Sequence, residues 1–353
     1  MLRLVLGTLT SARGWRLAAA GTGAAALCLA GLAAAAPAGA ATPAHPAAAA
    51  TGSASHPGGL IPGPLPPPAS TLQQVTNFGP NPTNLQMYLY VPPHVRPHPA
   101  VLVALHYCGG SGPAFFNGTE FASLADIYGF IIVYPSVTRT SLDCFDVSTP
   151  GALTHNGDSD PAGIVSMVRY VQQHLHADRH RVFATGISSG AMMTNVLLGD
   201  YPNVFQAGSV MSGVAFGCFA TTDGSLWNSD CANGDISKTP QQWGDIVRAA
   251  DPGYRGPRPR MQLWHGTADT ILFYPNFTEE VKEWANVLHA SPAHTDHPQP
   301  TWTHTVYAGR GHQTEVDAYS VAGETHNLGF DYPDWAQLAL QFFGLTGHHA
   351  ASG

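Results

Sequence analysis

The sequence predicts an α/β fold, in which a mostly parallel central sheet is covered by helices on both faces. The first observation is a set of short apolar runs rich in β-branched residues, of which VLVAL at 101–105 and IIVY at 131–134 are the clearest. Such runs are typical of strands that are buried on both faces. The second observation is that helical patterns separate the runs, as crossovers between parallel strands require.

The remaining elements follow the same alternation. Apolar residues at helical spacing over 120–128 predict a helix between the first two strands. Asp160 and Pro161 are expected to open the next helix as its N-cap and first residue. Later runs predict strands at 181–185, 208–214, 261–264, 302–308 and 315–321, and helices at 189–198 and 334–345.

The first forty residues have the composition of a secretory signal peptide. Arg3, Arg13 and Arg16 precede an apolar Ala/Leu run, which ends in the small residues AGA at 38–40, as signal peptidase requires. We therefore expect residues 1–40 to be removed on export, which leaves a secreted protein with no stable membrane association. A membrane anchor is the alternative, because the run is nearly long enough to span a bilayer.

A change of composition separates this segment from the rest. Residues 41–70 contain 8 Ala, 8 Pro and 4 Gly and no charged side chain, which predicts an unstructured linker. We expect one folded domain over 71–346 and a short C-terminal tail over 347–353. Any binding to an insoluble polymer is then expected from the domain itself.

The charge balance excludes two classes of partner. The chain has 15 Lys and Arg against 23 Asp and Glu. Three of the basic residues and none of the acidic ones lie in 1–70, which leaves 12 against 23 and a net charge near −11. Such a surface repels phosphate groups, so nucleic acids and anionic lipids are not expected partners.

Four cysteines lie in the expected domain, and an even number in an exported protein favours two disulfides. Cys218 and Cys231 flank the turn-rich segment TTDGSLWNSD, whose composition suits a closed loop. Although three pairings are possible, we expect these two to pair, which leaves Cys108 with Cys144. A zinc site is the competing interpretation, but the sequence has no CxxC pair and its 18 histidines are scattered. No metal site is therefore expected.

The pentapeptide GISSG at 186–190 lies between a predicted strand and a predicted helix. Its two glycines leave room for neighbouring backbone if the turn holds Ser188 in a strained, exposed conformation. The helix N-terminus behind it offers amide groups and a positive dipole to a developing oxyanion. Ser188 is therefore the candidate nucleophile.

A serine nucleophile needs a base, and the base needs an orienting group. Asp269 follows the predicted strand 261–264, at the carboxyl edge of the sheet, where such sites lie. His326 follows the last predicted strand at the same edge, whereas His312 precedes that strand, about 25 Å away. We expect Asp269 and His326 to complete the triad, with His312 as the alternative base and Asp251 as a turn residue.

The glycine-rich run HYCGGSG at 106–112 follows the first buried strand. Such a loop can aim a backbone amide at the substrate oxygen, with the amide of Ser189 as the second donor. A flexible turn that only the topology requires is the alternative.

These segments together resemble the secreted acetyl xylan esterases, feruloyl esterases and polyhydroxybutyrate-depolymerase-type esterases of carbohydrate esterase family one. The most specific match is the nucleophile segment, VFATGISSGAMMTN at 182–195. The other matching runs are LTHNG at 153–157, FGC at 216–218, WNSDC at 227–231, ISKTPQQWG at 236–244 and QLWHGTADT at 262–270. The resemblance extends over most of residues 85–345.

The resemblance implies an α/β-hydrolase fold and a triad of Ser188, Asp269 and His326. It also implies oxyanion donors at the amides of Cys108 and Ser189, and a hydrolysis that needs no metal or organic cofactor. Tyr107 is a departure, because many members carry glycine at this position. Its side chain is expected to narrow the acyl pocket.

Three functions are compatible with these residues. The first is a secreted serine carboxylic-ester hydrolase that removes acetyl or feruloyl groups from xylan. The second is a short-chain polyhydroxybutyrate depolymerase or general esterase. The third is a non-hydrolytic binding or acyl-transfer protein on the same scaffold, although the intact Ser, Asp and His argue against it. The expected partner is an ester-substituted polysaccharide or a polyester.

Overall fold

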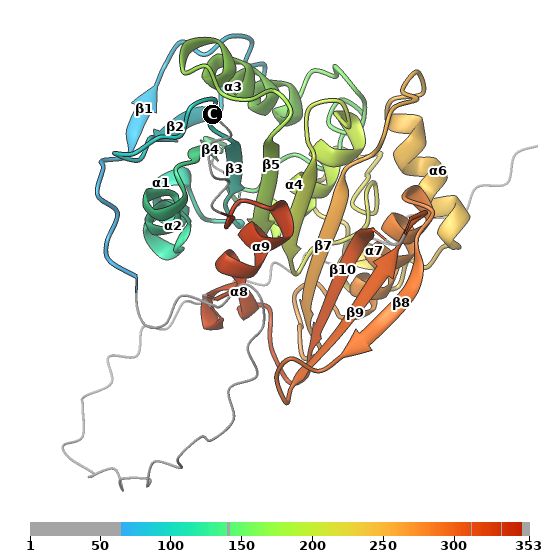
Figure 1. Ribbon diagram of the computed structural model, residues 1–353. Helices are drawn as coiled ribbons and strands as arrows, with labels where there is room; N and C mark the ends of the chain where they lie inside the picture. The colour runs from blue at the N-terminus through green and yellow to red at the C-terminus, as the bar shows by residue number, and fades with distance from the viewer. Residues whose placement is uncertain (1–64, 140–141, 312, 333, 348–353) are drawn as a thin grey trace, which may run out of the picture. The chain divides into compact units, whose positions relative to one another are not determined.

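A ten-stranded sheet forms the centre of the part of the chain that the computed structural model describes, residues 65–139, 142–311, 313–332 and 334–347 (Figure 1). The strand order is β1-β2-β4-β3-β5-β6-β7-β10-β9-β8. The strands are β1 Gln73–Val75, β2 Gln86–Tyr90, β3 Val101–Leu105, β4 Ile131–Ser136, β5 Val182–Ile187, β6 Ala207–Met211, β7 Arg260–Gly266, β8 Ser291–Asp296, β9 Trp302–Ala308 and β10 Thr314–Val321.

The sheet is parallel from β4 through β3, β5, β6 and β7 to β10, and antiparallel at both edges. This arrangement confirms the expected mostly parallel sheet. The helices that connect the strands are α1 Gly112–Gly118, α2 Phe121–Tyr128, α3 Asp160–His174, α4 Ser189–Asp200, α5 Ser229–Ala232, α6 Pro240–Ala250, α7 Pro275–Val287, α8 Leu328–Asp331 and α9 Trp335–Phe343.

Strand β3 shows how the sheet separates two hydrophobic cores. Val101, Val103 and Leu105 belong to the core that α3, α4, α6 and α7 cover, whereas Leu102 and Ala104 belong to the core under α1, α2 and α9. All five side chains are fully buried. Burial of a Val or Leu side chain stabilises the fold by about 1.5–3 kcal/mol. The unbroken apolar run is therefore explained by two covered faces.

Two residues of the expected linker, Ala69 and Ser70, are hydrogen-bonded to the domain. The amide of Ala69 donates to Asp126 Oδ2 at 2.7 Å, and that of Ser70 donates to the Tyr90 hydroxyl at 3.2 Å. These two bonds give the amides partners that a free linker would lack. The expected signal peptide, residues 41–64 of the linker and residues 348–353 of the tail lie outside the described residues.

The chain divides into two units, Met1–Ala54 and Ser55–Gly353, and every described residue belongs to the second. None of the helices described here is both long and apolar enough to cross a bilayer. The second unit contains the disulfides Cys108–Cys144 and Cys218–Cys231, which are the two expected pairs. Each disulfide stabilises the fold by restricting the unfolded chain. For a loop of the length that Cys218 and Cys231 close, this stabilisation is about 3 kcal/mol.

Helix α7 places two carboxyl groups in the core. Glu280 and Glu283 are both buried, and Glu280 Oε1 accepts a hydrogen bond from Asn195 Nδ2 at 3.4 Å. Burial raises the pKa of Glu280 from 4.5 to about 8, and the bond from Asn195 offsets this only in part. Burial and the neighbouring Glu280 also raise the pKa of Glu283 well above its usual value. Both groups are therefore neutral in the folded state near pH 6.

We expect stability to fall as the pH rises from about 4.5 to about 8, because only the unfolded chain releases these protons at lower pH. The stabilisation is complete below the unfolded pKa and is lost as the pH passes the folded pKa. The free energy of unfolding, measured with urea, should decrease between pH 5 and pH 8 in the wild type. In Glu280→Gln this decrease should be smaller by at least about 1 kcal/mol. Glu324→Gln, on a partly exposed loop, should keep the wild-type loss. An unchanged loss in Glu280→Gln would contradict the prediction.

Candidate active site

Ser188 lies in a tight turn between β5 and α4, with φ 57° and ψ −117°. A positive φ is uncommon and strained for a residue other than glycine. Close packing of the backbone enforces the turn. A Cβ at Gly186 would lie 2.4 Å from the carbonyl carbon of Gly190, and one at Gly190 would lie 2.1 Å from the carbonyl oxygen of Leu105. Only glycine fits at both positions, so α4 begins directly against β5 and β3.

Asp269 and His326 meet at the carboxyl edge of the sheet. The strands β7 and β10 are parallel neighbours, and Gly266 lies opposite Val321 at their ends. The loops that follow carry Asp269 and His326, whose Oδ2 and Nδ1 atoms are 2.7 Å apart. Gly266 lets the loops approach, because a Cβ there would lie 2.3 Å from the carbonyl oxygen of Glu324. The structure therefore brings together the two residues that the strand order predicted.

The carboxylate of Asp269 is buried but well supplied with donors. Its Oδ1 accepts the amides of Ile271 and Leu272 at 2.9 and 3.0 Å, and its Oδ2 lies 3.3 Å from His265 Nε2. Burial alone would raise the carboxyl pKa. The hydrogen bonds from His265 and His326 outweigh burial and hold the pKa of Asp269 well below its usual value. Asp269 is thus ionised and can orient the His326 ring through Nδ1.

Two buried histidines that the sequence did not single out support the same edge. His265, which ends β7 just before Gly266, contacts the carbonyl oxygen of Leu272 through Nε2 at 2.8 Å. His106 follows β3 directly; its Nε2 accepts the amide of Val137 at 3.1 Å, so Nδ1 carries the proton and donates to the carbonyl of Tyr107 at 2.7 Å. Burial lowers the pKa of His106 and favours this neutral form. Their signal in the sequence is a histidine at the end of a buried strand.

A cavity of about 430 Å³ opens over these residues. Ser188 and His326 both line it, so the candidate nucleophile and the candidate base share one surface. Tyr107 and Phe330 form an aromatic wall, with ring centroids 5.2 Å apart and planes at 89°. Phe330 and Ile271 are exposed, which gives the mouth an apolar rim. The cavity is lined by Tyr107, Cys108, Ile187, Ser188, Ile271, His326, Asn327 and Phe330.

One short segment is bound to both expected oxyanion donors. Cys144 forms the disulfide with Cys108, and the amide of the next residue, Phe145, donates to Ser189 Oγ at 2.8 Å. Ser189 is the first residue of α4, where backbone amides have no acceptor within the helix. The geometry therefore leaves the positive end of α4 next to Ser188.

Comparison with known proteins finds similarity to esterases. The family model described as "Esterase PHB depolymerase" matches residues 85–227. Feruloyl esterase B from Talaromyces stipitatus is 43% identical over 284 residues, which cover 79% of this chain and 77% of that protein. The chain belongs to this esterase family. It is therefore a carboxylic ester hydrolase.

The esterase is also similar to a solved structure and to further family members. The acetyl xylan esterase from Aspergillus awamori superposes with a TM-score of 0.73 at 41% identity, over 78% of this chain and all of that one. Feruloyl esterase B from Thermothelomyces thermophilus is 46% identical over 78% of this chain and 94% of that protein. The α/β-hydrolase fold expected from the sequence is confirmed.

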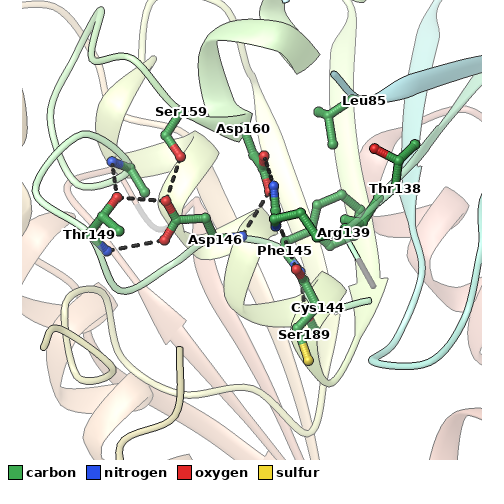
Figure 2. Close-up of polar contacts among 12 residues, drawn as sticks. Leu85, Thr138, Arg139, Cys144, Phe145, Asp146, Thr149, Ser159, Asp160 and Ser189 are labelled. Carbon is green, nitrogen blue, oxygen red and sulfur yellow. Dashed lines mark hydrogen bonds and ion pairs between the residues drawn. The ribbon is translucent and has the colours of Figure 1, made fainter. Parts of the chain in front are cut away.

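Figure 2 shows an ion pair that holds the segment with Cys144 and Phe145 in the esterase. The Nη1 and Nη2 atoms of Arg139 contact the two carboxylate oxygens of Asp160 at 2.8 and 2.6 Å. Nη2 also donates to the carbonyl of Cys144 at 2.9 Å, and Asp160 Oδ2 accepts the amide of Asp146 at 2.8 Å. The segment is therefore fixed on both sides of Phe145.

The position of Asp160 in α3 differs from the expected one. The N-cap is Ser159, and Asp160 and Pro161 are the first two helical residues. Asp160 does not cap the helix because its carboxylate pairs with Arg139. The hydroxyl of Ser159 does not cap it either, since it donates to Asp146 Oδ2 at 2.6 Å. The prediction that Asp160 is the N-cap is wrong because a tertiary ion pair takes its side chain.

The other candidates from the sequence lie elsewhere. His312, the alternative base, falls outside the described residues. Asp251 is the C-cap residue of α6 and does not line the cavity. Within the described ranges, no group of three or more His, Cys, Asp or Glu side chains could hold a metal ion.

Proposed function

We propose that this esterase is secreted and removes acetyl groups from xylan, with feruloyl groups as the alternative acyl substituent. The observation that carries the chemistry is that Ser188 and His326 line one cavity while Asp269 binds the imidazole. The choice of substrate is supported by relatives named as acetyl xylan and feruloyl esterases. Export is supported by the two disulfides and by the pattern of residues 1–40.

Hydrolysis proceeds in two steps under this proposal. His326 takes the proton of Ser188 Oγ as the oxygen attacks the ester carbonyl, while Asp269 stabilises the imidazolium. The amides of Cys108 and Ser189 bind the negative charge on the carbonyl oxygen. Collapse of this intermediate releases the alcohol and leaves an acyl-serine. A water that gives its proton to His326 then releases the acid, and no step requires a metal or organic cofactor.

A second candidate substrate is a short-chain polyester. It is favoured by the description of the matching family model, which names a PHB depolymerase. The apolar rim of the cavity, with Ile271 and Phe330, could bind either an acylated sugar or an aliphatic chain. The chemistry at Ser188 is the same for both.

A comparison of substrates tests the proposed function. We expect release of acetate from acetylated xylan to exceed turnover of both methyl ferulate and amorphous polyhydroxybutyrate at equal ester concentration. Higher turnover of the polyester would favour the second candidate. Absence of turnover of all three, in a folded protein that still binds saccharide, would contradict the assignment of this chain as a polysaccharide esterase.

Variants of the two histidines test the triad. His326→Ala should lower kcat on a small aryl acetate by about 10³-fold or more, because Ser188 loses its base. His312→Ala is the matched control and should change kcat by less than about tenfold. Ser188→Ala should abolish burst formation of an acyl-enzyme. Circular dichroism establishes that each variant is folded, and the opposite ranking of the histidines would move the base to His312.

The aromatic wall of the cavity should control the size of the acyl group. Tyr107→Gly removes the ring that packs edge-on against Phe330. We expect it to raise the ratio of kcat/KM for methyl ferulate over aryl acetate by about tenfold, because a wider pocket accepts a bulkier acyl group. Tyr107→Phe keeps the ring and should leave the ratio within about twofold of wild type. An unchanged ratio in Tyr107→Gly would mean that the ring does not line the acyl pocket.

A further inference from the structure

A second cavity, of about 670 Å³, lies at the opposite edge of the sheet from Ser188. It is bounded by Arg260, the first residue of β7, by Glu315 near the start of β10, and by Gln206, which precedes β6. These strands are parallel, and the candidate catalytic residues follow their carboxyl ends. The seven residues of β7 separate the two edges by about 20 Å. This cavity, which we call the arginine groove, is therefore distinct from the active site.

The arginine groove is basic in an acidic protein. Its described lining residues include Arg248, Arg255, Arg258 and Arg260, and the one carboxylate among them is that of Glu315. These are four of the 12 Lys and Arg residues in 71–353, a region with 23 acidic residues. Basic side chains with low-dielectric walls concentrate anions in a cleft. The groove thus favours a ligand that the rest of the surface repels.

Two of the guanidinium groups each have one buried nitrogen without a hydrogen-bond partner among the described residues. These nitrogens are the Nη1 atoms of Arg248 and Arg258. Arg248 still contacts Asp245 and Asn286 through its other nitrogens, whereas Arg258 makes no ion pair within these ranges and lies over the ring of Tyr254 at 5.7 Å. Burial and the nearby Arg248 lower the pKa of Arg258. An anion bound here would supply the missing acceptors.

We propose that the arginine groove binds the carboxylate of an acidic saccharide, such as a uronate unit of a polysaccharide. The planar guanidinium presents paired N–H groups that match a carboxylate. The groove is far larger than one inorganic anion, and it adds the Tyr254 ring for a sugar face and the side chains of Gln206 and Gln313 for hydroxyl groups. The choice of a saccharide rests on the proposed function, but the charge recognition does not require Ser188.

Calorimetric titration of the full protein tests the groove. The probes are a xylo-oligosaccharide that bears one glucuronate, the neutral oligosaccharide of equal length, and sodium sulfate, all free of ester. We expect the glucuronate compound to bind at least tenfold more tightly than the neutral one. Prior modification of Ser188 by an organophosphate should leave this affinity unchanged, so a failure of the proposed catalytic role leaves this test intact.

Paired variants assign the binding to the arginine groove. Arg258→Gln should weaken binding of the glucuronate compound by about tenfold, as for loss of a charged hydrogen bond. Arg169→Gln makes the same charge change at an exposed position of α3, outside the groove, and should leave affinity within about twofold of wild type. Equal affinity for the two oligosaccharides, or equal loss in both variants, would overturn the proposal. Sulfate that binds as tightly as the glucuronate compound would also overturn it, because the groove would then recognise charge without a saccharide.

Discussion

The close contact between α4 and the sheet is the constraint on which the site depends. Gly190 lies so near the carbonyl oxygen of Leu105 that no side chain fits between them, and Gly186 is equally close to Gly190. The helix must therefore start directly at the end of β5, and the residue at the turn takes a positive φ. In this conformation Ser188 lines the cavity, and the N-terminus of α4 lies beside it. The surrounding core holds this strained conformation in place, because every residue of α4 is buried.

Close backbone contact at a glycine also explains why Asp269 and His326 meet. Gly266 allows the end of β7 to contact the backbone of the loop after β10. The hydrogen bond between Asp269 and His326 then joins two loops that are 57 residues apart in the sequence. Parallel register fixes both strand ends at one edge, so each loop needs to supply only one correctly aimed side chain. The site is thus a product of strand order and three close glycine contacts, at Gly186, Gly190 and Gly266, rather than of a continuous motif.

The sequence could predict the features that depend on local pattern and on strand ends. Strands β3 and β4 contain unbroken apolar runs, and the candidates Ser188, Asp269 and His326 follow from rules about strand ends. Helix α7 was not predicted because its inner face carries buried glutamates beside Phe277 and Trp284, which breaks the apolar periodicity. Strand β8 was not predicted because it is an exposed edge with the polar sequence SPAHTD. The contacts of His265 and of Arg139 depend on the folded positions of loops, which local pattern does not specify.

Whether a buried carboxyl group in this protein is ionised depends on its hydrogen-bond donors and not on burial alone. Asp269 receives donors on both oxygens and stays ionised, whereas Glu280 has one long hydrogen bond and stays protonated near neutral pH. The contrast shows that burial raises a carboxyl pKa unless enough donors offset it. The two edges of the sheet differ in the same way, in whether the protein supplies hydrogen-bond partners to its charged groups. At the carboxyl edge every acceptor of Asp269 is satisfied by the protein itself, which gives a site that is organised before substrate arrives. At the amino edge, Nη1 of Arg258 has no such partner among the described residues, so a water or an anion from outside these residues is needed to supply its acceptor.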